Sequence, residues 1–249
     1  MHVLIVFAHP EPRSFNGSLK DLAVETLTAA GHEVRVSDLY AAKFGAVTGP
    51  ADFLCERADP DYLSIAQEQT HAYKNGAFTA EIVAEQEKVT WADLVIFQFP
   101  MWWFGMPAVL KGWVDRVFAR GFAYIAGRKY DTGLLGGRLA MVSTTTGTSA
   151  ETYAPSGIDG DINNILWPIH NGILRYTGFN VLPPHVAYMP GKVSALERNA
   201  YLNSYRQRLL EIEHTPRLFF HPADDYGSDE RLKPGIVARS GFQRNTEPH

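Results

Sequence analysis

The chain has 249 residues, of which 45% are hydrophobic and 20% are charged, and its formal net charge is −4. This length is enough to bury one full core in a single α/β domain, and the weakly acidic balance gives no compositional support for binding to nucleic acid or acidic membranes. The only cysteine, Cys55, cannot form an internal disulfide, which fits a reducing compartment.

The N-terminal region predicts a β-α-β unit. Val3–Ala8 is a continuous apolar run that suits a strand buried on both faces of a parallel sheet. Ser18–Ala30 has helical spacing and ends before Gly31, a common left-handed stop, and Glu33–Ser37 alternates as a second strand. The first apolar run is too short to span a membrane and lacks the basic start of a signal peptide, so we expect a soluble, cytoplasmic protein.

Helices and strands alternate through the rest of the domain. Tyr62–Trp91 is expected to form two helices broken near Asn75–Gly76, and Leu94–Phe99 is the most hydrophobic strand candidate. The five expected strands predict an α/β fold with a doubly wound parallel sheet in the order 2-1-3-4-5 and helices on both faces. The remaining elements are expected at Ala108–Ala119, Leu139–Thr145, Ile162–Tyr176, Ala195–Ile212, and Asn180–Tyr188, a strand that Pro183-Pro184 interrupts.

The character of the sequence changes after Thr215. Residues 1–215 carry the expected α/β domain, whereas residues 216–249 contain prolines, glycines and clustered charge without a clear period. We expect this C-terminal segment to be an irregular tail that either frays or lies along a partner subunit.

Three loops of unusual composition are expected to meet at one crevice. Ligands of an open doubly wound sheet bind beyond the carboxyl ends of the strands, where the strand order reverses. The first and third strands end before His9–Asn16 and Pro100–Gly105, which places these two loops side by side. The fourth strand ends on the same edge, at Thr144–Thr148.

Each loop has a functional and a simpler interpretation. The first leads into a helix N-terminus that favours an anion, although it matches no nucleotide-binding glycine fingerprint, and its polar residues can equally cap the helix. The second carries three consecutive aromatic residues, which suit a flat ring system or the packing of a core or interface. The hydroxyl-rich third loop suits the polar rim of such a ring or is an ordinary strand end. The donors available in the first loop are His9, Arg13, Ser14 and Asn16.

Five parts of the sequence carry a recognisable pattern. They are Leu4-Ile-Val-Phe-Ala-His-Pro with Ser14-Phe-Asn-Gly, Ser37-Asp-Leu-Tyr, Asp93-Leu-Val-Ile-Phe-Gln-Phe-Pro, Trp103-Phe-Gly-Met-Pro-Ala-Val-Leu-Lys-Gly-Trp, and Gly160-Asp-Ile-Asn-Asn-Ile-Leu-Trp-Pro. This pattern closely resembles the NAD(P)H:quinone oxidoreductase (DT-diaphorase) family, which has a flavodoxin-like fold. The resemblance implies a homodimeric FAD enzyme with a shared active site, in which hydride passes from NAD(P)H through FAD to a quinone-like acceptor in a two-electron, ping-pong reaction.

The resemblance also implies which residues contact FAD. The implied contacts run from the pyrophosphate to the ring face, the ring edge and the adenosine end. In that order they are His9, Ser14, Phe15 and Asn16; Pro100, Met101, Trp103 and Phe104; Thr145, Thr146, Gly147 and Thr148; and Arg198 and Leu202, with Ser64 close to a further adenosine contact.

The implied catalytic pair departs from the family pattern. Tyr153 matches a tyrosine beside the pyrimidine carbonyl of the flavin, and Asp159 stands where the family has the histidine partner of that tyrosine. An ionised carboxylate there would repel the charge that reduction places on the ring, so we expect Asp159 to be protonated, turned away or replaced by water.

The implied substrate pocket departs from the family as well. Thr148 replaces a glycine, and Ala126 replaces a second tyrosine that gates the pocket beside Tyr124, a residue contributed by the other subunit. The loss of that ring predicts a wider acceptor site, and the charge of Lys129 predicts tolerance of anionic acceptors. The pocket residues are Trp103, Phe104, Tyr124, Ala126, Lys129, Gly147, Thr148 and Tyr176.

Other functions remain open from the sequence. An FMN-dependent azo- or nitroreductase would share the fold without adenine contacts, and a flavodoxin-type electron carrier or a flavin-free binding module would share it without the reaction. No hydrolase elbow and no metal-ligand spacing of the nine histidines is present, so no metal site is expected.

Overall fold

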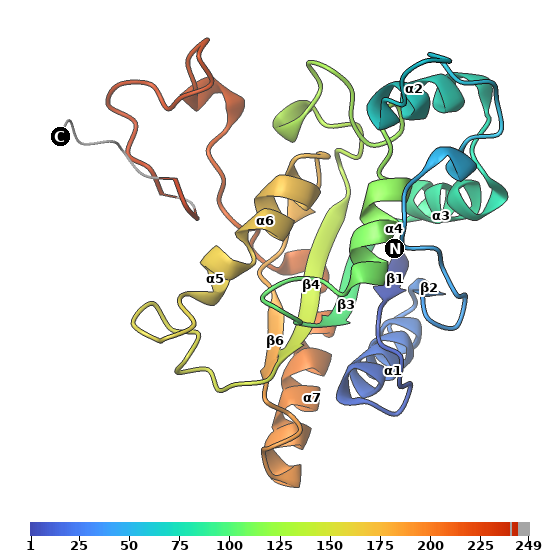
Figure 1. Cartoon of the computed structure of the whole chain (residues 1–249). Coiled ribbons are helices and arrows are strands. Elements are labelled where there is room, and N and C mark those ends of the chain that lie inside the picture. The colour runs from blue at the N-terminus through green and yellow to red at the C-terminus, as the bar shows by residue number, and fades with distance from the viewer. Residues whose placement is uncertain (240, 244–249) are drawn as a thin grey trace.

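A six-stranded parallel sheet forms the centre of the molecule (Figure 1). The computed structural model describes residues 1–239 and 241–243. The strand order is β2-β1-β3-β4-β5, with β6 also paired to β4, which confirms the predicted 2-1-3-4-5 order. The strands are β1 (His2–Phe7), β2 (Glu33–Asp38), β3 (Leu94–Pro100), β4 (Leu139–Thr146), β5 (Asn180–Val181) and β6 (His185–Tyr188).

The expected fifth strand is present but divided. β5 pairs with the start of β4, at Leu139 and Ala140, and β6 pairs with its end, from Ser143 to Thr146. Pro183 and Pro184 lie between the two halves, and proline has no N–H to donate to a neighbouring strand. The predicted interruption is therefore a gap in the pairing on this side of β4.

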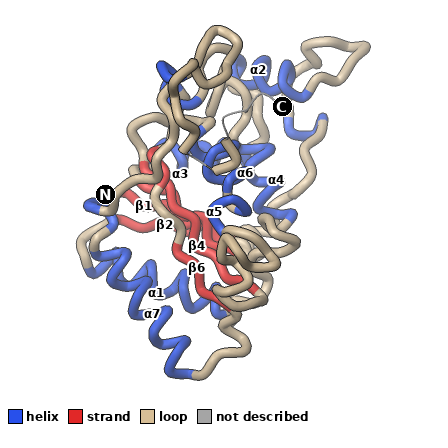
Figure 2. The backbone as a smooth tube through the Cα atoms, turned by 90° about the vertical axis from the view of Figure 1, so that its left-hand side faces the viewer, coloured by secondary structure: helices blue, strands red, loops and turns tan. Residues whose placement is uncertain are grey.

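Helices cover both faces of the sheet (Figure 2). α1 and α7 pack on one face around Ile5, Ile96 and Met141, and the remaining helices lie toward the other face, around Phe97 and Trp113. The helices are α1 (Phe15–Ala29), α2 (Ile65–Asn75), α3 (Ala80–Trp91), α4 (Ala108–Val117), α5 (Ile162–Ile165), α6 (Trp167–Ile169) and α7 (Ala195–Leu210).

One predicted helix is wrong in detail. The segment Ile162–Tyr176 is not continuous, because it consists of α5, α6 and a π-helical turn over His170–Arg175. Pro168 lies in the first turn of α6 and cannot donate a backbone hydrogen bond to α5. The regular α-helical hydrogen bonding is therefore interrupted within a segment that was expected to be one helix.

Buried charges fasten the layer formed by α3 and α4. Arg116 on α4 donates from Nε and Nη2 to Asp52 (3.0 and 2.8 Å) and from Nη1 to Glu81 on α3 (2.5 Å). Burial opposes the charge of Arg116, but the two carboxylates outweigh it and raise its pKa. Nearby, the buried carboxylate of Glu85 accepts hydrogen bonds from Ser37, Trp113 and Lys88. These contacts tie α3 and α4 to β2 and to the loop that contains Asp52.

The described part of the tail lies against its own chain, an arrangement that the sequence did not indicate. Lys129 Nζ pairs with Glu230 at 2.8 Å, and Arg175 donates to the carbonyl of His221. The Arg175 guanidinium also lies over the Phe220 ring, 5.2 Å from its centre. Residues 240 and 244–249 of the expected tail lie outside the described residues. Within the described ranges, no helix has the length and apolar character needed to cross a membrane.

Candidate active site

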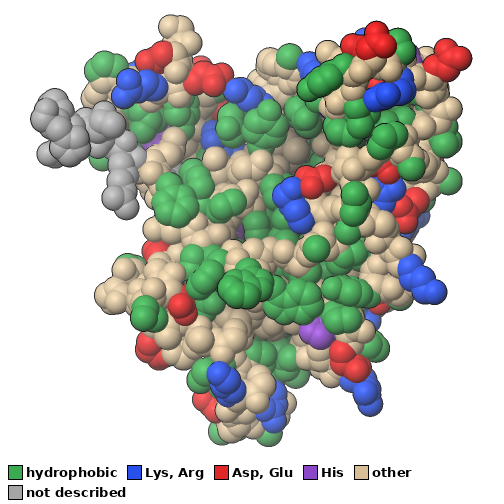
Figure 3. Space-filling model, viewed as in Figure 1, with side chains coloured by type: hydrophobic (Ala, Val, Ile, Leu, Met, Phe, Trp, Pro, Cys, Tyr) green, Lys and Arg blue, Asp and Glu red, His purple; other side chains and the backbone are tan. Residues whose placement is uncertain are grey.

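The loop after β3 presents aromatic rings to solvent. Trp102 and Gly105 exchange backbone hydrogen bonds (3.1 and 3.0 Å), which closes a tight turn. Within it, Trp103 and Phe104 both have left-handed backbones, with φ of 52° and 57°, a conformation that is strained for bulky residues. Their side chains are 99% and 51% exposed. The predicted alternative of core packing therefore fails for these rings. Hydrophobic side chains gather in a band across the middle of the face shown in Figure 3.

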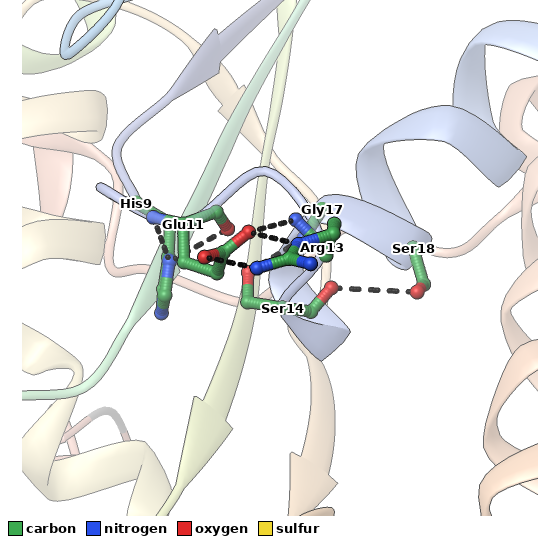
Figure 4. A network of polar contacts seen from close by, with 6 residues as sticks. All are labelled: His9, Glu11, Arg13, Ser14, Gly17 and Ser18. Carbon is green, nitrogen blue, oxygen red and sulfur yellow. Dashed lines mark hydrogen bonds and ion pairs between the residues drawn. The ribbon is translucent and has the colours of Figure 1, made fainter.

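The first loop is folded back onto itself (Figure 4). Arg13 donates hydrogen bonds from Nε and Nη2 to the carboxylate of Glu11 (3.0 and 3.3 Å), and these bonds lower the pKa of Glu11 to about 2. Ser14 caps α1 by accepting the N–H of Gly17 at 3.1 Å, as the capping interpretation predicted. Nδ1 of His9 lies 3.0 Å from the N–H of Glu11, so its Nε2 is the atom left for a ligand. Fewer side chains of this loop are therefore free to bind an anion than the sequence predicted.

Asn16 joins the first loop to the end of β4. Its Oδ1 accepts from Nε2 of Gln98, and its Nδ2 donates to Oγ1 of Thr145, both at 2.8 Å. The backbone N–H of Met101 in turn donates to the carbonyl of Thr145 at 2.8 Å. The three predicted loops therefore meet at the carboxyl edge of the sheet, as their topology indicated.

The third loop leads into a turn that contains both predicted catalytic residues. Thr152 donates to Oγ1 of Thr148, and Thr148 donates to Oδ2 of Asp159, both at 2.9 Å. The half-buried carboxylate of Asp159 is thus turned toward Thr148, the other residue at which this loop departs from the family pattern. Tyr153 packs between Phe104 and Tyr188, with ring centres 6.3 and 5.9 Å away. Phe104 thereby connects the aromatic loop to the turn.

The start of α7 lies at the same edge. Arg198 donates to the carbonyls of Val193 and Pro190 (2.6 and 3.3 Å), so its guanidinium holds the preceding loop. Leu202 is partly buried and packs with the cluster beneath α1 and α7. The rings of Phe15 and Tyr201 pack edge to face, with their centres 6.4 Å apart, and this contact holds α7 beside the first loop.

The other predicted pocket residues form a second group, at the opposite end of the sheet. Tyr124 and Tyr176 lie 5.5 Å apart and line a cavity of about 280 Å³. Burial, together with Tyr176, raises the pKa of Tyr124. Lys129 lines a further cavity of about 480 Å³, but Glu230 already pairs with its charge.

Two more predicted residues belong with this second group. Ala126 lies in the same exposed loop as Tyr124. Ser64 precedes α2, which Gln69 ties to the carbonyl of Asp115 near the end of α4 (3.0 Å). α2 lies far from the carboxyl ends of the strands (Figure 1). A single chain therefore does not bring Ser64, Tyr124, Ala126, Lys129 and Tyr176 to the crevice.

Sequence reasoning missed three residues at the crevice. Gln98 was read as part of an apolar strand, although a lone amide within Phe97-Gln98-Phe99 was a usable signal. Tyr188 and Lys192 approach from the segment after β6; Lys192 Nζ lies 3.3 Å from the carbonyl of Gly147. Burial is the main cause that raises the pKa of Tyr188. No periodicity marked these two positions.

Comparisons with known proteins agree with this fold. Residues 1–209 match the family model described as "Flavodoxin-like fold". The mouse protein ribosyldihydronicotinamide dehydrogenase [quinone] is 49% identical over 210 residues, which cover 84% of this chain and 91% of that protein. Rat NAD(P)H dehydrogenase [quinone] 1 is 44% identical over 240 residues, 96% of this chain and 87% of that protein. The crystal structure of a candidate quinone reductase from Klebsiella pneumoniae is 41% identical, with a TM-score of 0.92 over 99% of this chain and 98% of that one.

Proposed function

The chain belongs to the flavodoxin-like family of NAD(P)H quinone oxidoreductases, and on that premise we propose that it is an FAD-dependent NAD(P)H dehydrogenase (quinone). The exposed Trp103 and Phe104 rings carry the proposal. Two bulky residues in left-handed conformations cost free energy, and the nearly full exposure of Trp103 leaves little burial to offset it. Such a cost is retained where a ligand uses the rings.

The residues at the crevice fit a flavin. Trp103 and Phe104 supply apolar surface for a flat ring, while the hydroxyl of Thr148 and the backbone around Gly147 supply polar groups for its edge. A Cβ on Gly147 would meet no atom within 4 Å, so this backbone is open to a ligand. A bound flavin supplies hydride and electron transfer, which no side chain of the crevice provides.

FAD is the finer part of the proposal. The first loop and the start of α7 lie side by side, linked by Phe15 and Tyr201, so a cofactor that passes the first loop reaches Arg198 and Leu202. FMN ends at its phosphate and would not extend along α7. We assign the pyrophosphate to the N-terminal end of α1 and the adenosine to the α7 side.

Tyr153 is the proposed proton or hydrogen-bond donor to the reduced ring, and Asp159 is not. Oδ2 of Asp159 accepts the hydrogen bond of the Thr148 hydroxyl at 2.9 Å. Its orientation toward Thr148 keeps the negative charge engaged with a donor rather than with the ring. The Tyr153 ring packs against Phe104 and Tyr188, and no hydrogen bond among the described residues uses its hydroxyl, which leaves that group for the crevice.

A homodimer with shared sites follows from the separation of the two residue groups. Tyr124 follows α4 and pairs with Tyr176, which precedes the start of β5, whereas Tyr153 follows the end of β4. In a symmetric dimer the patch on one subunit faces the complementary patch on the other, so this group of the partner subunit would close the crevice. The exposed hydrophobic band is the surface that such an arrangement would cover.

The donor is proposed to be NAD(P)H, acting with a quinone-like acceptor at the same face. The match to the rat NAD(P)H-named relative extends over more of this chain than the match to the mouse ribosyldihydronicotinamide-named relative, and so reaches into the tail. Because Glu230 pairs with Lys129, we no longer expect Lys129 to attract anionic acceptors.

Heat release of the cofactor from the purified protein tests the proposal. Chromatography should identify FAD, and NADH or NADPH should bleach the bound flavin, which a quinone should then reoxidise. Release of FMN would replace the FAD assignment, a flavin that neither NADH nor NADPH bleaches would support an electron carrier, and a protein that takes up no flavin would refute the enzyme. Sedimentation velocity should give a dimer, and a monomer with full turnover would refute the shared site.

A further inference from the structure

Three buried side chains form one hydrogen-bonded line behind the crevice. Gln98 on β3 donates to Asn16 at the start of α1, and Asn16 donates to Thr145 at the end of β4. We propose that Gln98 is a positioning residue, which fixes the direction of this line so that the Thr145 hydroxyl is free to donate its proton to the bound cofactor. The proposal rests on the flavin site proposed above and assigns it a residue that does not touch the cofactor.

The direction of the line follows from the chemistry of its members. An amide has one accepting end and one donating end, whereas a hydroxyl can do either. Because Oδ1 of Asn16 accepts from Gln98, its Nδ2 must face Thr145, and Oγ1 of Thr145 must accept. Across the residues that the structure describes, no side-chain hydrogen bond uses the Thr145 proton. If the Asn16 amide turned over, the Thr145 hydroxyl would have to donate its hydrogen bond to Oδ1 of Asn16. It could then no longer donate to the cofactor.

Burial prevents water from reversing the line. Gln98 is 0%, Asn16 3% and Thr145 7% exposed, so each bond that breaks leaves a polar atom without solvent. Oε1 of Gln98 is itself buried and finds no partner within the described part of the chain, which is a cost to stability. A leucine at position 98 would fit the apolar strand better, so we infer that the amide is retained for its donating end.

Thr145 is well placed to act on a cofactor. It is the last but one residue of β4, and its carbonyl holds the N–H of Met101, the residue that precedes the aromatic turn. A hydroxyl proton at this edge would meet an acceptor atom of the ring edge or of a phosphate. The line thus couples the core of the sheet to one donor at the binding surface.

The hydroxyl itself is tested with a matched pair at position 145. Thr145→Val removes the hydroxyl, both the proton for the cofactor and the acceptor for Asn16, and keeps the shape, whereas Thr145→Ser keeps the hydroxyl. The flavin-free protein is titrated with FAD, and the dissociation constant is read from the quenching of flavin fluorescence. We expect Thr145→Val to bind FAD roughly tenfold more weakly and Thr145→Ser to bind it within about twofold of the wild type.

The direction of the hydrogen bonds in the line is tested with Gln98→Glu. Near pH 9 an ionised carboxylate at position 98 cannot donate, so Asn16 turns over and FAD affinity should fall roughly tenfold. Near pH 6 the carboxyl, whose pKa burial raises, is protonated and can donate to Asn16 again, so affinity should recover. The wild type has no titratable group in the line, so its affinity at each pH is the reference against which the variant is compared. Ser143→Ala is the control, because Ser143 is the β4 register partner of Gln98, equally buried and not hydrogen-bonded to Gln98, Asn16 or Thr145 in the described part of the chain.

The outcomes separate this inference from the proposed function. Gln98→Glu with the same affinity relative to the wild type at both pH values, or Thr145→Val with wild-type affinity, would overturn the inference alone. Equal weakening by Ser143→Ala would show a general packing effect and also overturn it. A wild-type protein that binds no flavin would overturn the proposed function and this inference together. If Gln98→Glu does not fold, the pair at position 145 decides.

Discussion

Glu85 and Asp159 carry the same charged group in opposite surroundings. The carboxylate of Glu85 is buried and accepts from Ser37, Lys88 and Trp113. The carboxylate of Asp159 is half-buried and accepts from the side chain of Thr148. A buried carboxylate is tolerated only when several donors meet it, whereas a partly exposed one can keep an oxygen free for a ligand.

The same difference extends to the regions around these two residues. Behind the sheet, Arg116 and Trp113 are buried and their polar atoms are paired, so that layer serves stability. At the crevice, Trp103 and Phe104 are exposed on a strained backbone. Substitutions in the first region should therefore act on folding, and those in the second should act on binding and turnover.

Arg116→Met should give the largest effect. It leaves Asp52 and Glu81 as unpaired charges, so the free energy of unfolding should fall by ~3–5 kcal/mol. Lys111→Met is the control on the same helix, because the Lys111–Asp115 pair is exposed and worth about 0.5 kcal/mol. Urea unfolding measures both. A loss of quinone reductase kcat without a loss of stability would contradict the division between the regions.

Tyr153→Phe should give the largest effect at the crevice. If the phenol supplies a proton or hydrogen bond to the reduced ring, the rate of flavin reduction should fall by about 10²-fold or less, with stability unchanged. Stopped-flow reduction by NADH or NADPH measures this rate. Tyr188→Phe, which alters the neighbouring ring, is the control and should change the rate less than about threefold. An unchanged rate for Tyr153→Phe would remove Tyr153 from the mechanism.

His185 should make the fold sensitive to acid. Burial and the charge of Arg208 lower the pKa of His185 from 6.5 to about 4. Between these values the unfolded chain takes up a proton that the folded chain refuses, so stability is full above pH 6.5 and declines as the pH falls toward 4. The cost at pH 5 is ~2 kcal/mol.

His185→Gln should remove that part of the pH dependence. Urea unfolding at pH 7 and pH 5 should show a smaller loss of stability in the variant than in the wild type. An equal loss in the variant and the wild type would mean that protonation of His185 does not cause the loss of stability at pH 5. His170 is buried as well, with a pKa lowered to about 4, and should account for a similar share of the remaining decline.

The sequence predicted the framework better than the contacts. The buried strands Val3–Ala8 and Leu94–Phe99 are apolar runs in the sequence because both of their faces are covered. The alternation of strands and helices along the chain then predicted the strand order. The three loops followed from that topology. The hydrogen-bond partners of Gln98 and Arg116 could not be predicted in this way. Asn16 lies 82 residues from Gln98 and Asp52 lies 64 residues from Arg116, and no local sequence pattern encodes such pairs.

Backbone strain was equally hidden from the sequence. Consecutive aromatic residues at positions 102–104 indicated that a ring would face outward, but not that the turn between Trp102 and Gly105 would be left-handed at two bulky residues. The division of the predicted pocket residues between two ends of the sheet also needed the structure, because Tyr124 precedes β4 and Tyr153 follows it.

Trp103→Gly should give the smallest effect on stability and one of opposite sign. Glycine adopts a positive φ without strain, and the 99% exposed ring contributes little burial, so the flavin-free protein should gain about 1 kcal/mol. FAD should bind more weakly, because the ring surface is lost. Lys43→Gly relieves the same kind of backbone at an exposed position and should stabilise without changing FAD affinity. A Trp103→Gly protein that is less stable without flavin would show that the ring serves the fold, and the contrast between the two regions would then fail at this loop.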